Sequence, residues 1–168
     1  MTAEPVTAPA TAAPGPVVGF APGEVLTDRP TREARLKWVL VVDETLPAGR
    51  VVNAAACIAA GTGASVAGLV AGGGPDASGT VHPGLPWTGC AVLAATPEQL
   101  AALRERAVAD PDLHVVDMPA VAQAHRVYDD YLAELATTPP EAVAACAVSV
   151  VGPRNRVDRL VRRLALLP

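Results

Sequence analysis

The sequence has 168 residues, of which 51% are apolar, enough for one domain with a buried core. The formal net charge of −4 excludes a domain-wide basic field, so nucleic acid is a disfavoured partner. The chain has three cysteines, Cys57, Cys90 and Cys146, and no C-x-x-C spacing. This argues against a disulfide framework and against a zinc site, and it favours a cytoplasmic location. We expect neither a signal peptide nor a membrane span.

Residues 1 to 33 are rich in proline and alanine and show no helical or strand periodicity. This composition buries too little apolar surface to fold on its own, so we expect a disordered tail. The tail is either a solvated leader or an arm that binds a partner. We expect a single α/β domain over residues 34 to 168.

The first element after the tail is residues 36 to 42, where an apolar run lies between Lys37 and Asp43. Such a run predicts a strand that is buried on both faces of a sheet. The alanine-rich residues 51 to 60 predict a helix that Gly61 ends. A strand that leads into a helix places the N–H groups of the helix start at the carboxyl edge of the sheet, where ligands of open α/β folds usually bind.

The least regular stretch is residues 63 to 84. Its Asp-Ala-Ser-Gly sequence at residues 76 to 79 is typical of a turn and predicts a small hairpin between residues 66 to 71 and residues 80 to 82. The His-Pro-Gly sequence that begins at His82 is expected to form a stiff, extended loop.

The rest of the domain alternates strands with helices. Thr96 and Gln99 form a capping-box pattern, with proline at the first helical position, and predict a helix directly after a strand. The further predicted strands are residues 90 to 95, 113 to 118 and 145 to 151, and the further helices are residues 97 to 109, 120 to 136 and 154 to 164. This alternation predicts a three-layer α/β/α domain with a mostly parallel or mixed four-stranded sheet.

Two segments at opposite ends of this domain follow a known pattern. The lysine-led strand at residues 37 to 42, followed by Gly49-Arg50, and the closing residues 150 to 167 resemble the first strand, helix start and closing strand-turn-helix of the type-II peptidyl-tRNA hydrolases. A closer resemblance is to the uncharacterised family named domain of unknown function 2000 (DUF2000), which is assigned to the same fold. The positions that match it are Val42-Asp43, Gly49, Asn53-Ala54, His82-Pro83-Gly84, Gln123, Tyr128, Tyr131 and Gly152-Pro153.

The resemblance implies a peptidyl-tRNA hydrolase II-like fold over about residues 35 to 168, with a site near the start of the first long helix. The hydrolases have a lysine after the helix-start glycine, where this chain has Arg50, and Lys37 is the only lysine in the chain. Arginine stays protonated and presents a planar fork, whereas lysine is a point charge that can lose its proton. Transfer RNA is therefore a disfavoured partner of this site.

Gly49, Arg50 and Asn53 are the candidate ligand-binding residues. Backbone N–H groups and a guanidinium fork can hold a carboxylate or phosphate, and Asn53 lies one helical turn further on. The alternative is that Arg50 is an ordinary surface arginine. These residues predict a small anionic molecule as the ligand.

Lys37, Asp43, His82 and Asp117 are the candidate catalytic residues. Lys37 would supply charge, Asp43 a general base, His82 a group that titrates near neutrality, and Asp117 a second carboxylate at the same edge. The alternatives are structural: a turn-capping aspartate and an exposed loop histidine. No histidines have metal-ligand spacing, and we expect neither a metal nor a cofactor.

Three functions stay open at this point. The first is a hydrolase or acyl-transfer enzyme acting on a small anionic or aminoacyl-type substrate at the edge of the first strand. The second is a non-catalytic module that binds a small ligand or a partner. The third is a peptidyl-tRNA hydrolase in which arginines of the last helix contact phosphates, although no aromatic residues lie among them to stack bases. A homodimer also stays open.

Overall fold

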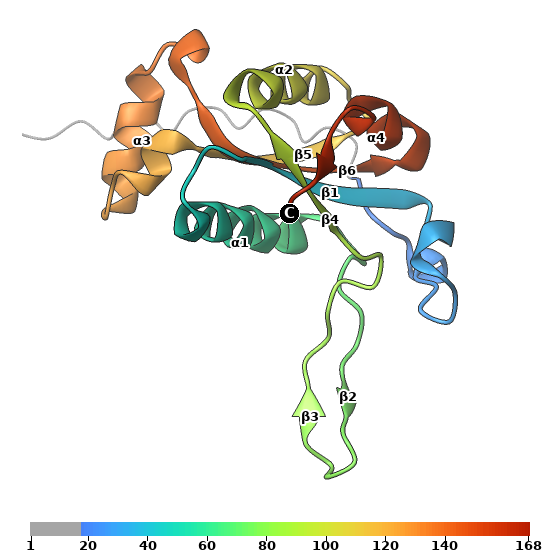
Figure 1. Ribbon diagram of the computed structural model, residues 1–168. Coiled ribbons are helices and arrows are strands. Elements are labelled where there is room, and N and C mark those ends of the chain that lie inside the picture. Colours follow the sequence, from blue (N-terminus) through green and yellow to red (C-terminus); the bar gives the residue numbers. More distant parts are fainter. Residues whose placement is uncertain (1–17) are drawn as a thin grey trace, which may run out of the picture.

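The computed structural model describes residues 18–168, and Figure 1 shows their arrangement. Residues 1 to 17 of the predicted tail lie outside the described residues. The strands are β1 (Leu36–Asp43), β2 (Gly74–Pro75), β3 (Val81–His82), β4 (Ala91–Ala95), β5 (His114–Pro119), β6 (Ala145–Pro153) and β7 (Ala165–Leu166). The α-helices are α1 (Ala48–Ser65), α2 (Pro97–Val108), α3 (Tyr128–Thr137) and α4 (Arg154–Val161), with short 3-10 turns at η1 (Pro22–Glu24), η2 (Thr31–Glu33), η3 (Ala120–Gln123) and η4 (Pro140–Ala142).

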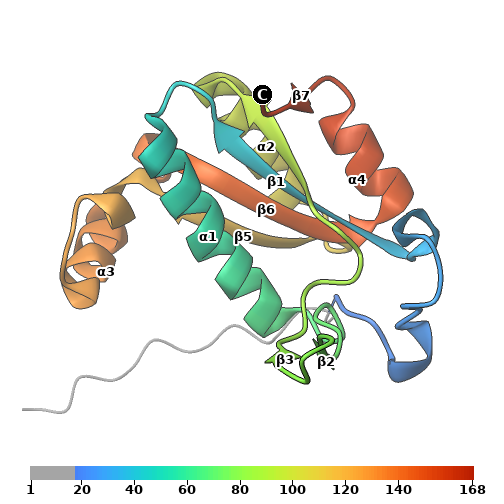
Figure 2. The same ribbon diagram turned by 60° about the horizontal axis from the view of Figure 1, so that its bottom comes forward.

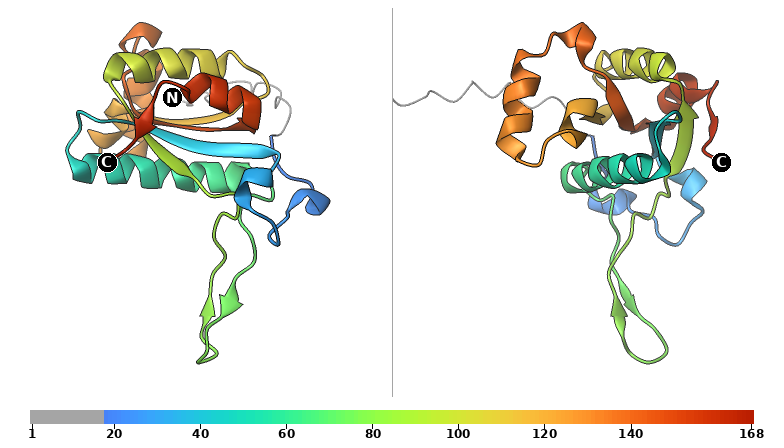
Figure 3. Two further views of the ribbon diagram at one scale, coloured as in Figure 1. Left: turned by 45° about the vertical axis from the view of Figure 1, so that its right-hand side comes forward. Right: turned by 60° about the vertical axis from the view of Figure 1, so that its left-hand side comes forward.

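A mixed five-stranded sheet with the order β5-β6-β1-β4-β7 forms the centre of the molecule. β1 and β4 are parallel, and the other neighbouring strands are antiparallel. α1 covers one face of the sheet, α2 and α4 cover the other, and α3 lies beyond the β5 edge (Figures 2 and 3). The predicted α/β class and mixed sheet are confirmed, but the sheet has five strands instead of four.

β1 is buried on both faces because helices cover both sides of the sheet. Trp38, Leu40 and Val42 pack in the apolar cluster under α1, whereas Val39 and Val41 pack in the cluster under α2 and α4. This alternation is the normal side-chain period of a strand, and two apolar faces explain why the whole run is apolar.

α1 is longer than predicted because Gly61 does not end it. A Cβ atom at Gly61 would lie 3.2 Å from Cγ1 of Val116, so the glycine allows α1 to approach β5 closely. The helix continues to Ser65 and ends where the N–H of Val66 bonds to the carbonyl of Thr62. Although α1 is rich in alanine, no helix within residues 18–168 has the length and apolar character to cross a bilayer.

The predicted helix at residues 120 to 136 is broken into η3 and α3. After Pro119, the N–H of Ala120 donates to the carbonyl of Ala144 at 2.8 Å, which ties η3 to the chain before β6. Val127 is extended, so α3 starts as a separate helix. None of the residues of α3 is buried, in agreement with its position outside the sheet edge.

The last predicted helix ends early, and the chain after it forms a fifth strand. α4 stops at Val161, and Ala165 and Leu166 pair antiparallel with Ala94 and Leu93 of β4. The edge of β4 offers backbone N–H and C=O groups that need partners, and β7 supplies some of them. The prediction of a continuous helix to residue 164 was therefore wrong.

The segment before β1 packs on the domain from at least Phe20. Phe20 is only 4% exposed, its ring lies 5.0 Å from the ring of Trp87, and its N–H donates to the carbonyl of Ala67 at 2.8 Å. Folded chain therefore starts earlier than the predicted boundary at residue 34.

The predicted hairpin exists, but with a different first strand. The strand at Val81–His82 pairs with Gly74–Pro75 and not with residues 66 to 71, because antiparallel pairing propagates directly from the turn at residues 76 to 79. Asp76 stabilises that turn because its Oδ1 accepts a hydrogen bond from the N–H of Ser78 at 2.8 Å. The hairpin projects from the body of the molecule (Figure 1).

A chain of buried hydrogen bonds joins β1, β6 and α1. The indole N–H of Trp38 donates to Ser149 Oγ at 2.9 Å, and Ser149 Oγ lies 2.7 Å from Thr62 Oγ1. Thr62 donates its proton to the carbonyl of Ile58, so Ser149 must donate to Thr62. Every group in this chain is therefore satisfied.

We predict that Ser149→Ala lowers the free energy of unfolding by about 1–3 kcal/mol, because it leaves the buried indole N–H of Trp38 without an acceptor. Urea unfolding would measure the loss. The control, Thr27→Ala, removes a hydroxyl from an exposed turn and should change stability by less than about 0.5 kcal/mol. Equal stability of Ser149→Ala and the wild type would contradict the prediction.

Candidate functional site

Four polar side chains meet where the carboxyl end of β1 leads into α1. Arg50 and Asn53 lie in the first turns of α1, Gln123 ends η3, and Cys146 is the second residue of β6. β6 runs antiparallel to β1, so its first residues lie beside the end of β1. η3 follows β5, whose carboxyl end pairs with the same start of β6. We call these four residues the polar ring.

Gln123 holds the polar ring together. The Nε of Arg50 donates to Gln123 Oε1 at 2.7 Å. Gln123 Nε2 in turn donates to the backbone carbonyl of Arg50 and to Asn53 Oδ1, both at 3.0 Å. The side-chain amide therefore fixes the guanidinium group and the amide of Asn53 relative to α1.

Cys146 closes the polar ring from the sheet side. Its Sγ lies 3.9 Å from Nη2 of Arg50 and donates to Gln123 Oε1 at 3.6 Å. Burial raises the pKa of the Cys146 thiol, the charge of Arg50 opposes that rise, and nearby Asp43 adds to it. The thiol is therefore protonated at neutral pH and is not poised as a thiolate nucleophile.

Arg50 keeps hydrogen-bonding capacity for a ligand. A guanidinium has five N–H donors, of which Nε bonds to Gln123 and one Nη2 hydrogen faces Cys146. Within residues 18–168, the other donors have no acceptor at hydrogen-bond distance. A Cβ atom at Gly49 would meet nothing within 4 Å, so the approach to this end of α1 is open.

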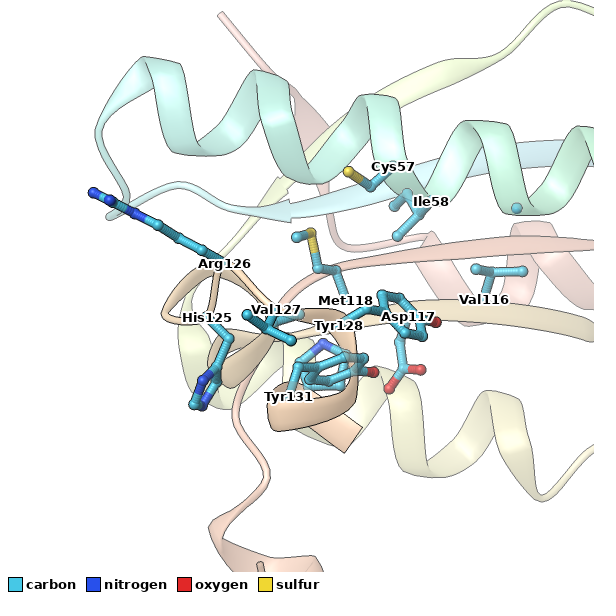
Figure 4. A pocket seen from close by; sticks show the side chains of 13 residues that line it. Cys57, Ile58, Val116, Asp117, Met118, His125, Arg126, Val127, Tyr128 and Tyr131 are labelled. Carbon is cyan, nitrogen blue, oxygen red and sulfur yellow. The ribbon is translucent and has the colours of Figure 1, made fainter. Parts of the chain in front are cut away.

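A pocket of about 450 Å³ lies beside the polar ring, between α1, β5 and the segment from η3 to α3 (Figure 4). Cys57 and Gly61 line it from α1, and Cys57 lies one helical turn beyond Asn53. Ala122 lines it from η3, directly before Gln123. The pocket and the polar ring therefore share two walls.

The far wall of the pocket carries two tyrosines of α3. Tyr128 and Tyr131 form an edge-to-face pair with ring centroids 5.4 Å apart. Tyr131 and Asp117 point toward one another in Figure 4, and burial, together with Tyr128 and Asp117, raises the pKa of Tyr131. The Tyr131 phenol is therefore protonated at neutral pH and can donate a hydrogen bond.

Asp43 is the one predicted catalytic residue that lies near the polar ring. It is buried at the end of β1, and its Oδ1 accepts hydrogen bonds from the N–H of Thr45 at 2.9 Å and from its hydroxyl at 2.7 Å. These bonds match the turn-capping alternative. The influence of Asp43 on the pKa of Cys146 shows that its carboxylate is close enough to act electrostatically on the polar ring.

Lys37 lies at the opposite end of β1 from Asp43. They are six positions apart along an extended strand, which corresponds to about 20 Å. The Nζ of Lys37 forms an ion pair with Asp158 Oδ1 of α4 at 2.5 Å. The fold therefore does not bring this lysine to the carboxyl edge of the sheet.

His82 and Asp117 are also apart from the polar ring. His82 lies on the projecting hairpin, where its ring is 3.3 Å from the carboxylate of Asp76. The Ser78 hydroxyl, then His82, lowers the pKa of Asp76 to about 2. Asp117 forms an ion pair with Arg104 of α2 and lines the pocket. The catalytic roles of these residues stay predictions, but the structure does not collect them in one site.

Gln123 and Cys146 are site residues that chemical reasoning from the sequence did not single out. Gln123 entered only as a position of family resemblance, and Cys146 only in the cysteine count. No local pattern in the sequence indicates either residue, because both reach α1 only through the order of the strands. Helical spacing indicates only the neighbouring face of α1, on which Asn53 and Cys57 lie one turn apart. That face leads from the polar ring into the pocket.

A serine-histidine pair occurs at the other end of α1, away from the polar ring. Ser65 Oγ lies 2.8 Å from His114 Nε2, but the hydroxyl donates its proton to the carbonyl of Gly61. His114 therefore donates to Ser65 and does not serve as its base. Burial lowers the pKa of His114, which keeps it neutral. No group of three potential metal ligands occurs within residues 18–168.

The pattern of the DUF2000 family, described as a protein of unknown function, matches residues 36–168. The chain belongs to the DUF2000 family. A solved structure of a protein of unknown function from Agrobacterium tumefaciens strain C58 is similar, with a TM-score of 0.74 and 16% sequence identity over 80% of this chain and 98% of that chain. No curated protein sequence matches the chain.

Membership of DUF2000 confirms the resemblance seen in the sequence, and the matched residues include the polar ring and the pocket. At 16% identity, the solved structure shows a shared fold and no activity. The likeness to type-II peptidyl-tRNA hydrolases stays a prediction, as do the roles of the site residues.

We predict that iodoacetamide alkylates Cys57 before the other cysteines in the native DUF2000 protein. Cys57 and Cys90 are both exposed, but desolvation raises the pKa of the Cys90 thiol to about 12, so it forms less of the reactive thiolate. Cys146 is buried, and burial also raises the pKa of its thiol. Mass spectrometry of timed samples would give the order. Labelling of Cys146 before Cys57 without unfolding would contradict this geometry.

Proposed function

We propose that this DUF2000 protein binds a small molecule with a carboxylate group, which Arg50 holds while the rest of the ligand lies in the pocket between α1, β5 and α3. The observation that carries the proposal is the fixed guanidinium group of the polar ring. Gln123 bonds to its Nε and leaves Nη donors without acceptors in the described chain. A guanidinium fork in a fixed orientation is suited to a bidentate carboxylate.

The dimensions of the site limit the size of this ligand. Arg50 and Cys57 are seven residues apart on α1, which corresponds to about 10 Å along the helix. The pocket of about 450 Å³ lies within the range of small-molecule sites. A molecule of the size of an acylated amino acid can therefore reach Arg50 with one end and the pocket with the other.

The lining of the pocket, which includes Asp117, His125 and Arg126 beside apolar residues, supports a ligand with an apolar body and some polar groups. Ile58, Val116 and Met118 supply apolar surface from α1 and β5. The protonated Tyr131 supplies a hydrogen-bond donor from α3. This combination of apolar walls with a small number of fixed polar groups is typical of small-molecule sites.

We predict that Arg50→Gln weakens the binding of N-acetyl-leucine and N-acetyl-phenylalanine at least about tenfold, because the charge-assisted bond to their carboxylate is lost. Isothermal titration calorimetry at low salt would measure the affinities. The control, Arg32→Gln, removes the same charge from the exposed turn η2 and should bind like the wild type. N-acetyl-leucine amide, which has no carboxylate, should not distinguish Arg50→Gln from the wild type. Equal affinity of both variants for the acids would contradict the proposal.

A second candidate function is a hydrolase or acyl-transfer reaction at the same site, and the position of Asp43 favours it. Both bonds from Thr45 go to Oδ1 of Asp43, so Oδ2 can accept a proton from water. Asp43 Oδ2 would take a proton from a water as its oxygen attacks the carbonyl carbon of an ester. The bond from that carbon to the alcohol oxygen then breaks, and the protonated Asp43 returns its proton to the leaving alcohol. Peptidyl-tRNA, the substrate suggested by the fold resemblance, is one ester of this kind.

For such an enzyme, we predict that Asp43→Asn lowers the turnover of aminoacyl esters about 100-fold or more, because asparagine cannot act as a general base. The affinity for the ligand should stay unchanged, because asparagine has nearly the same shape as aspartate. Release of the free amino acid from aminoacyl ethyl esters and from peptidyl-tRNA would be measured for both proteins. Absence of turnover by the wild type on all of these substrates would exclude this second candidate and leave the binding function intact.

A further inference from the structure

A hollow of about 330 Å³ lies between α2 and α4, on the face of the sheet opposite to α1. Arg106 of α2 lines it from one side. Arg159, Arg162 and Arg163 line it from α4 and the residues that follow. Gln99 adds a side-chain amide, and no carboxylate is among the lining residues. This is a local concentration of positive charge in a chain whose net charge is −4.

Three other cations around α4 have partners outside the hollow. Arg156 binds Asp110 and Asp112, and Lys37 binds Asp158. The guanidinium group of Arg154 donates to the backbone carbonyls of Thr31 and Ala34.

The arginines of the hollow differ from these cations. Arg106 donates once, to the carbonyl of Leu160 at 3.0 Å. Arg159, Arg162 and Arg163 form no ion pair or side-chain hydrogen bond within residues 18–168. Arg159 helps to lower the pKa of Asp110, but it is Arg156 that binds the Asp110 carboxylate. The guanidinium groups that line the hollow therefore have N–H donors without acceptors in the described part of the chain.

The helix end explains only part of this arrangement. Cations near the last turn of α4 interact favourably with its partial negative charge, by a fraction of a kcal/mol for each exposed side chain. Four arginines around one hollow also repel one another. An anion with several charges would remove that repulsion and accept bonds from more than one guanidinium group.

We propose that this hollow binds a small molecule with two or more linked phosphate groups. Arginine presents planar pairs of donors that match phosphate oxygens. The floor of the hollow is apolar, formed by Ala102, Leu103 and Leu164, so a compact organic body can lie against it. The volume is at the lower end of the range for small-molecule sites.

The observations favour a small phosphate compound over RNA. No aromatic side chain lines the hollow, so bases have no stacking surface. The hollow is bounded by two helices, and the net charge of the whole chain repels an extended polyanion. A compact ligand meets the arginines without crossing the acidic remainder of the surface.

The test is calorimetric titration of the full chain at low salt with inorganic tripolyphosphate and with ATP. We expect binding of both probes by the wild type, and affinity at least about tenfold weaker in the double variant R159Q/R162Q. The matched control, R29Q/R32Q, removes two exposed arginines before β1 and should bind like the wild type. A second variant, R159K/R162K, keeps the charge and loses the planar fork, and should bind with intermediate affinity.

Several outcomes would overturn the proposal. One is that the wild type binds neither probe at about 1 mM. Another is that R159Q/R162Q and R29Q/R32Q weaken the affinity for the probes equally. Binding of tRNA that depends on Arg159 and Arg162, without binding of tripolyphosphate, would replace the proposal with an RNA surface. Circular dichroism melting of each variant would show that lost affinity does not reflect lost folding. An excess of N-acetyl-leucine should not displace tripolyphosphate bound at the hollow, which separates this site from the polar ring.

Discussion

The buried chain of hydrogen bonds from Trp38 through Ser149 to Thr62 fixes the position of α1 on the sheet, and the polar ring depends on that position. Such bonds are directional, whereas the apolar contacts around them would tolerate a helix that slides or rotates. Leaving any member without its partner is costly in a dry core. A helix held in this way presents Arg50 and Asn53 in a defined orientation.

The second constraint is the order of the strands. β6 lies between β5 and β1, so the start of β6 and the end of β5 both lie beside the start of α1. This brings Gln123 and Cys146 to Arg50, although they are far apart in the sequence. The same order leaves β5 at the edge of the sheet, with α3 beyond it. None of the residues of α3 is buried, and two of its side chains line the pocket.

The two faces of the sheet offer different chemistry. On the α1 face, one fixed guanidinium stands at the end of a largely apolar pocket, which suits a ligand with a single carboxylate and an apolar body. On the other face, several arginines without acid partners surround a smaller hollow, which suits a compact molecule of higher charge. The sheet lies between the two sites.

The sequence by itself determined the long strands and the capped start of α2, because apolar runs and capping residues act locally. It also placed Arg50 beside Asn53, since residues three apart share one face of a helix. Only the tertiary structure decided that Gln123 completes their network, that Lys37 lies at the far end of β1 with Asp158, and that the chain after α4 forms a strand on β4. Those outcomes depend on which strands become neighbours, and neighbours in a sheet are chosen by contacts between distant segments that local sequence patterns do not encode.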